Sequence, residues 1–179
     1  MGHHTEGHRH DREHLRHRHP APGAHGPPRP ANGNCGDAFE AAFALGCQIG
    51  DPCWEGLGAR GIGLVKIVNG DFGEGIRWLD DARVRCVRVP DAYLWILGYC
   101  LDTLCEQAIT HGVIGAEGWV GELEAVAGRT GMDELLVRAQ LHRFALGKPG
   151  ARESAGVFAE RIDNPAVLRR VESRRPILA

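Results

Sequence analysis

Three residues in one apolar stretch have the side-chain types of a thiol-catalysed active site: Cys100, Asp102 and His111. Such a site needs a base within hydrogen-bonding reach of the sulfur and a third group that orients the base. If residues 91–111 form a helix, Cys100 and Asp102 point about 200° apart around its axis. His111 then lies at the end of that helix. We therefore predict that these side chains do not converge and that the chain is not an enzyme.

A second group, Cys47, Cys53 and Cys86, has side chains that could bind zinc. None of the cysteines forms a CxxC pair, and each of these three lies on an apolar stripe or beside a helix cap. We therefore expect reduced thiols, most of them buried in the core. Because no secretory leader is visible, we expect the protein to be cytoplasmic.

Residues 1–36 are rich in His, Pro and Gly, and Leu15 is their only large aliphatic side chain after Met1. A segment with so little apolar area cannot offset its ordering entropy, so we predict a disordered tail. His-rich tracts also bind zinc, nickel or copper, which makes a metal-handling function the alternative hypothesis. The metal ligands in that alternative are His3, His4, His8, His10, His14, His17 and His19. A solvated tail, or sequence upstream of the natural start, explains the composition without metal.

The segment GLGARGIG, residues 56–63, has the glycine spacing of a nucleotide-binding loop. No strand precedes it, so we interpret it as part of a helix on which a neighbouring backbone packs closely, and we predict no cofactor. The formal net charge of −2 shows no basic excess, so we expect no direct nucleic-acid contact. Residues 92–101 are continuously apolar but fall short of the roughly 20 residues that a membrane span needs.

Helical periodicity recurs along the chain, and no segment alternates with the period of a strand. Breaks of two to five residues separate the helices, with N-caps at Asp37, Asp51, Asp71 and Asp91 and a turn at Gly70. His142 is interpreted as a surface or packing residue. We predict seven helices: residues 37–49, 52–69, 71–88, 91–111, 116–129, 132–146 and 151–163. The fold class is therefore all-α over residues 37–163, followed by a frayed tail over 164–179.

The helices pair in succession, and the first helices of three pairs begin at residues 52, 91 and 132. Helix–turn–helix units of about 34 to 45 residues are typical of an α-solenoid. The pattern resembles tetratricopeptide repeats: Ile62-Gly63, Gly70, Gly75, Leu79 and Ala82 fit the repeat register, and Leu97-Gly98 repeats the large–small pair. Gly75 replaces the usual Ala and the units are longer than standard. The resemblance therefore implies a degenerate, lengthened solenoid of antiparallel helices.

Residues 46–65 and 75–102 also resemble the C-terminal helical-repeat region of large bacterial ATP-dependent LuxR-type transcriptional regulators. That resemblance implies a scaffold or sensor segment that binds partners or an effector. The chain has no GxxxxGK[ST] loop and no basic recognition helix. Residues 37–49 look like the second half of a unit whose first half is missing, so we expect a fragment or trimmed descendant of such a regulator.

The leading functional hypothesis is a non-catalytic protein-interaction module in transcriptional or signalling regulation. Solenoids bind partners on the concave surface made by the first helices. On this basis we expect a protein or peptide partner in a groove lined by Arg60, Tyr99, Asp102 and Glu106, or self-association of the chain. On helix 91–111, Asp102 and Glu106 are expected to face solvent or the partner.

Overall fold

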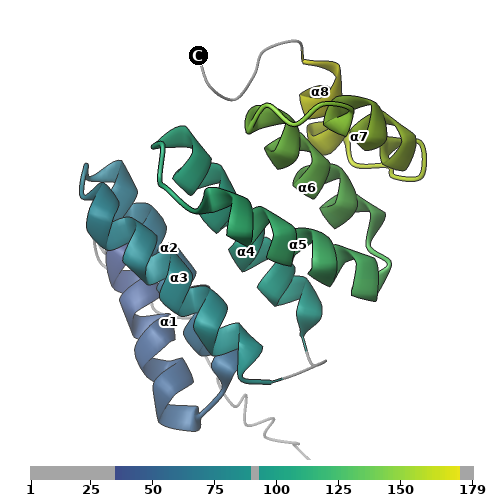
Figure 1. Cartoon of the computed structure of the whole chain (residues 1–179). Coiled ribbons are helices and arrows are strands. Elements are labelled where there is room, and N and C mark those ends of the chain that lie inside the picture. Colours follow the sequence, from purple (N-terminus) through teal and green to yellow (C-terminus); the bar gives the residue numbers. More distant parts are fainter. Residues whose placement is uncertain (1–34, 90–92, 174–179) are drawn as a thin grey trace, which may run out of the picture. The chain divides into compact units, whose positions relative to one another are not determined.

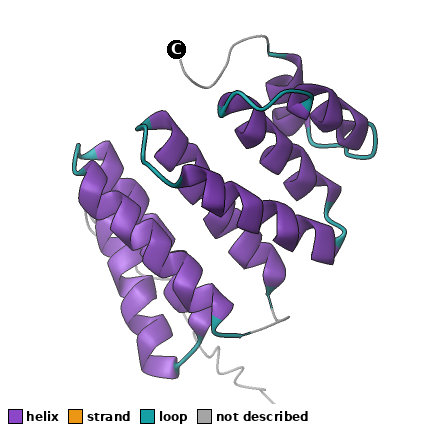
Figure 2. Ribbon diagram, in the orientation of Figure 1, coloured by secondary structure: helices purple, strands orange, loops and turns teal. Residues whose placement is uncertain are grey.

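The computed structural model describes residues 35–89 and 93–173, and all regular secondary structure in these ranges is helical (Figures 1 and 2). This confirms the all-α prediction for the described part of the chain. The helices are α1 (Cys35–Ile49), α2 (Pro52–Val68), α3 (Phe72–Val87), α4 (Leu94–Thr110), α5 (Ala116–Thr130), α6 (Asp133–Ala145), α7 (Ala151–Ala159) and α8 (Pro165–Glu172). None of them combines the length and apolar character that a membrane-spanning helix requires.

Local capping chemistry sets several of the boundaries. Asp51 accepts a hydrogen bond from the backbone N–H of Cys53 at 2.8 Å, and Pro52 occupies the first helical position of α2. Asp71 caps α3 through the N–H of Glu74, and Gly70 before it is left-handed at φ +86°. Asp37 is not an N-cap, because α1 begins at Cys35 and places Asp37 in its first turn. Asp91 lies outside the described residues.

Each helix packs against the next helix in the sequence. The even-numbered helices also contact one another in succession, α2 with α4, α4 with α6, and α6 with α8. Among the described residues, no two odd-numbered helices approach within 8 Å between Cα atoms. The helices therefore form one series in which the even-numbered members are in direct contact.

Helix α4 lies at the centre of this series and contacts α2, α3, α5 and α6. Eleven of its 17 residues are buried, including Leu97, Leu101 and Leu104. Other helices therefore cover this apolar helix on more than one face.

The glycines of α2 permit the close approach of two neighbouring helices. A Cβ atom on Gly58 would stand 2.6 Å from the backbone of Phe43 in α1, and one on Gly63 would stand 2.9 Å from the carbonyl oxygen of Gly75 in α3. Any larger residue would push these helices apart. Residues 56–63 are thus a helix-packing segment, as the sequence predicts.

The C-terminal boundary differs from the prediction. Residues 165–172, expected to be frayed, form helix α8, and Val167 is completely buried against α6 and α7 residues such as Val137 and Ala155. The Asn164 side chain caps this helix by accepting from the N–H groups of Ala166 and Val167. The described residues therefore hold eight helices, one more than the seven predicted.

Candidate functional site

The three residues first considered for thiol chemistry have three different partners. The sulfur of Cys100 lies 3.9 Å from that of Cys86, and the Asp102 carboxylate contacts His142. The His111 ring stacks on Phe72 with 4.1 Å between ring centroids. The structure therefore does not bring Cys100, Asp102 and His111 together.

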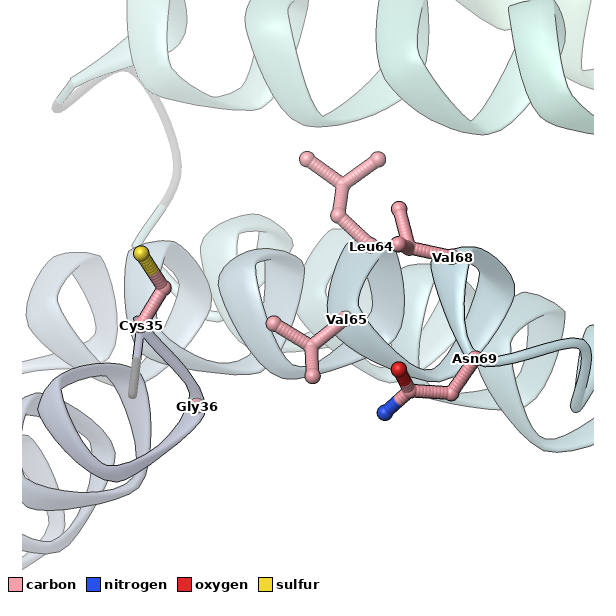
Figure 3. Close-up of a pocket in the computed structure, with 6 residues that line it drawn as sticks. All are labelled: Cys35, Gly36, Leu64, Val65, Val68 and Asn69. Carbon is pink, nitrogen blue, oxygen red and sulfur yellow. The ribbon is translucent and has the colours of Figure 1, made fainter. Parts of the chain in front are cut away.

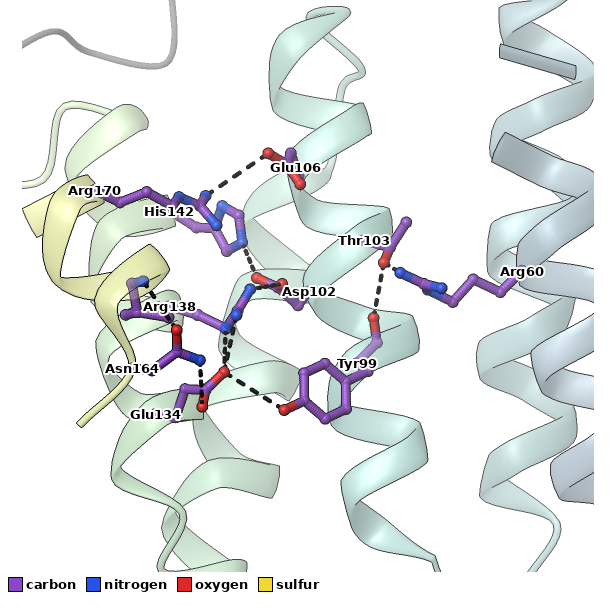
Figure 4. A network of polar contacts seen from close by, with 11 residues as sticks. Arg60, Tyr99, Asp102, Thr103, Glu106, Glu134, Arg138, His142, Asn164 and Arg170 are labelled. Atoms are coloured by element: carbon purple, nitrogen blue, oxygen red, sulfur yellow. Dashed lines mark hydrogen bonds and ion pairs between the residues drawn. The ribbon is translucent and has the colours of Figure 1, made fainter. Parts of the chain in front are cut away.

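A polar network joins α4, α6 and α8, and it contains three of the four predicted groove residues (Figure 4). Asp102 lies at its centre: Oδ2 accepts from Arg138 at 2.7 Å, and Oδ1 lies 2.8 Å from Nε2 of His142. Because an ionised carboxylate can only accept hydrogen bonds, Nε2 of His142 is the protonated nitrogen that donates to Asp102. Asp102 is 5% exposed and His142 is 0% exposed.

The network extends outward from this centre through Glu134. Its Oε1 accepts from Arg138 at 2.8 Å and lies 3.5 Å from the Tyr99 hydroxyl, and its Oε2 accepts from Asn164 at 3.1 Å. Because Asn164 also caps α8, this bond ties the start of α8 to α6. Glu106 forms a longer ion pair, 3.8 Å, with Arg170 of α8.

Arg60 belongs to a neighbouring contact. Its Nε donates to the Thr103 hydroxyl at 2.7 Å, and that hydroxyl donates to the backbone carbonyl of Tyr99 at 2.9 Å. Arg60 thereby connects α2 to the same side of α4 from which Tyr99, Asp102 and Glu106 project. All four predicted groove residues thus lie on even-numbered helices, Arg60 on α2 and the other three on α4.

The expectation that Asp102 faces solvent or a partner is wrong. Burial alone would raise the pKa of Asp102, but the hydrogen bond from His142 and the charges of His142, Arg138 and Arg170 hold that pKa below its ordinary value. An ionised carboxylate is thus kept inside the protein by its partners, and it links α4 to α6. His142, expected at the surface or in packing, is its buried partner.

The network cannot perform acid–base chemistry on a substrate in this arrangement. A carboxylate beside an imidazole has the groups of a general base, but a base must reach the proton it takes. Both side chains are enclosed, and Nδ1 of His142 is buried with no hydrogen-bond partner among the described residues. We therefore interpret these residues as connectors between helices.

Sequence reasoning missed Glu134 and Arg138, and it named His142 only as a surface or packing residue. They are spaced at i, i+4 and i+8 and form one polar stripe along α6, a signal that was available in the sequence. The partner of this stripe is Asp102, which is far away in the chain, so the stripe alone does not reveal that it is buried.

An apolar pocket of about 300 Å³ lies where the start of α1 meets the end of α2 (Figure 3). It is lined by Cys35, Gly36, Leu64, Val65, Val68 and Asn69. Val68 is 84% exposed, so part of this lining is open to solvent. The pocket therefore offers space for an apolar group.

The outer face of α1 is also apolar, and no other described helix covers it, since α2 is the only one of them that approaches α1 within 8 Å between Cα atoms. Phe39, Phe43 and Gly46 turn toward α2, as the contacts of the α2 glycines and of Gly46 indicate. On the opposite side, Leu45 is 55% exposed and Ile49 is 58% exposed. We call this surface the α1 outer face: Ala38, Ala41, Ala44, Leu45, Gln48 and Ile49, all exposed.

The other sequence-predicted ligands do not form a metal site in the described part of the chain. Cys53 and Cys86 are buried as expected, whereas Cys47 is exposed. In residues 35–89 and 93–173, no group of three or more His, Cys, Asp or Glu side chains is placed to hold a metal ion. The histidines from His3 to His19 lie outside the described residues.

Comparisons with protein-family models, with curated proteins and with solved structures found no match for this chain.

Proposed function

We propose that the helical domain is a non-catalytic protein-interaction module with a tetratricopeptide-like α-solenoid architecture. In such an array the first helices of successive units touch along one layer, while the second helices are separated. The successive contacts of α2, α4, α6 and α8, and the absence of direct contacts between odd-numbered helices in the described residues, support this architecture. In this arrangement α1 takes the place of a second helix, and the described residues include no first helix for its unit.

The observation that carries the proposal is the α1 outer face. An end helix of a solenoid ordinarily carries polar residues on its outer side, because no further unit covers it. Here that side presents Leu45 and Ile49, each more than half exposed, among alanines. Exposed apolar surface of this kind marks contact sites with other proteins.

The partner that fits this surface is an amphipathic helix. A helix lying along α1 continues the helix-by-helix packing and can insert apolar side chains between those of Leu45 and Ile49. Helix α1 contains Asp37 and Glu40 but no basic residue, so the partner helix is expected to carry Lys or Arg beside its apolar stripe. Residues 1–34 offer Leu15 as their only large aliphatic side chain after Met1, which favours an outside partner.

The resemblance to LuxR-type regulators is the basis for placing the module in bacterial transcriptional or signalling regulation. In such a protein, the helix that covers α1 belongs to the preceding repeat or to a regulatory partner. The pocket between α1 and α2 is a second reason to place the binding surface at α1, because it can receive an apolar side chain of the partner.

The test is the double variant Leu45→Asp with Ile49→Asp. Complete burial of such a side chain stabilises a complex by about 1.5–3 kcal/mol, and each side chain is about half exposed, so the pair contributes about 2–3 kcal/mol. Partners are captured by cross-linking to the wild-type protein in lysate, purified, and titrated against both proteins by calorimetry. We expect the double variant to bind at least about tenfold more weakly.

The matched control is Val157→Asp in α7, because Val157 is also 55% exposed but lies away from α1. We expect this variant to bind as tightly as the wild type, and all three proteins to have the same circular dichroism spectrum. Equal binding by the double variant, or an equal loss in Val157→Asp, would show that α1 is not the binding surface.

A further inference from the structure

Two buried thiols face each other between successive helices. Cys86 lies in the last turn of α3 and Cys100 in the middle of α4, and their sulfur atoms are 3.9 Å apart. Cys86 is 5% exposed and Cys100 is 0% exposed. A third thiol, Cys53 of α2, is buried in the same core cluster.

The position of the Cys86 sulfur depends on a glycine in a third helix. A Cβ atom on Gly56 of α2 would lie 2.4 Å from this sulfur. A side chain of any size at position 56 would collide with this sulfur, so the absence of a side chain on Gly56 leaves the space that the thiol occupies. The sulfur is thus enclosed between α2 and α4.

The two thiols differ in acidity because of this contact. The hydrogen bond from Cys86 lowers the pKa of Cys100, against the effect of burial and with help from the positive charge of Arg60. The same hydrogen bond, together with burial, raises the pKa of Cys86. Cys100 is therefore the thiol that ionises first and the better nucleophile of the pair.

We propose that Cys86 and Cys100 are a redox-active pair that forms a reversible disulfide between α3 and α4 on reaction with a small hydroperoxide. The sulfur atoms must approach by about 2 Å to reach bonding distance. Cys86 lies one residue from the C-terminal end of α3, where helices open most readily. Local opening there can bring the Cys86 sulfur closer to the Cys100 sulfur and admit a small oxidant.

The reaction balances with hydrogen peroxide as the oxidant. The Cys100 thiolate attacks one peroxide oxygen, the O–O bond breaks, and the departing hydroxide takes a proton to become water. The sulfur of Cys86 then attacks the Cys100 sulfenic acid, an S–S bond forms, and the second hydroxide leaves with the Cys86 proton as water. Two thiols lose two protons and two electrons in total, and one peroxide becomes two water molecules.

The experiment uses the full chain with Cys35→Ser and Cys47→Ser, because these two thiols are exposed and would react first. The folded protein is treated with dilute hydrogen peroxide, then unfolded and alkylated, and its mass and peptides are analysed. Relative to the untreated protein, we expect two fewer alkyl groups and a further loss of about 2 Da for the two hydrogens, a cross-link between Cys86 and Cys100, and full reversal by dithiothreitol.

Two variants in the same background identify the pair. Cys105→Ala removes an equally buried thiol of α4 and should leave the cross-link unchanged. Cys86→Ala should abolish the cross-link and leave Cys100 as a sulfenic acid that dimedone labels. The proposal is overturned if the treated protein shows no cross-link, or if Cys53 or Cys105 replaces either partner. The absence of a cross-link is tested with both Cys86 and Cys100 in place, so it does not depend on whether a variant of either residue folds.

Discussion

The packing of α1 on α2 depends on a missing side chain at Gly58, and this makes a quantitative prediction. A Cβ atom there would stand 2.6 Å from both the N and Cα atoms of Phe43, whereas ordinary contact begins at 3.4 Å. The obstacle is backbone, so no rotamer change relieves it, and α1 must retreat by about 0.8 Å.

Two opposing effects set the magnitude for Gly58→Ala. Overpacking of this kind costs about 1–3 kcal/mol, and replacing Gly by Ala inside a helix gains about 0.5–1 kcal/mol. We therefore expect the free energy of unfolding to fall by about 1–2 kcal/mol. The control is Gly121→Ala in α5, where a Cβ atom meets nothing within 4 Å, so only the helical gain remains.

The assay is urea unfolding followed by far-ultraviolet circular dichroism, which reports the loss of helix directly. The two Gly→Ala variants should move the midpoint in opposite directions, lower for Gly58→Ala and higher for Gly121→Ala. If Gly58→Ala gains as much stability as Gly121→Ala, the close approach of α1 to α2 is refuted.

The remaining predictions concern residues of the central helix α4. Leu97→Asp should prevent cooperative thermal unfolding, because Leu97 is 5% exposed and an unpaired charge would be buried in its place; a normal transition in a thermal scan contradicts this. Glu106→Ala should lower the free energy of unfolding by less than about 1 kcal/mol in the same urea assay, since its 3.8 Å ion pair with Arg170 lies partly in solvent, and a larger loss contradicts this. Acid titration of the free energy of unfolding should show the contribution of Asp102. Its pKa is lower in the folded protein than the ordinary 3.8, so its stabilising effect is complete above pH 3.8 and is lost as pH falls through the folded-state pKa. In Asp102→Asn the decline of stability below about pH 4 should be shallower, and an identical decline would exclude this carboxylate as its source.

Local patterns in the sequence predict the helices well, because each helix depends on residues within a few positions. The Asp51-Pro52 pair marks the start of α2, and Gly70-Asp71 marks the break before α3. The same kind of signal, Asn164-Pro165, begins α8, so this helix was predictable and was missed because its apolar stripe is short.

The candidate sites could not be predicted in the same way. The stripe of Glu134, Arg138 and His142 is visible in the sequence, but its burial depends on how α6 meets α4. Asp102 looks like a solvent-facing residue on its own helix, since an unpaired buried carboxylate would be too costly. Only its distant partners make that position stable.

Sequence alone determined the all-helical character, the central place of the apolar helix α4 and the close packing at the glycines of α2. These features follow from helical periodicity and side-chain size, which are properties of neighbouring residues. The tertiary structure decided which side chains meet, such as Cys86 with Cys100, and which surface the described helices leave uncovered, as on α1. The reason is that contacts and exposure depend on the approach of whole helices, and residues far apart in the chain set that approach.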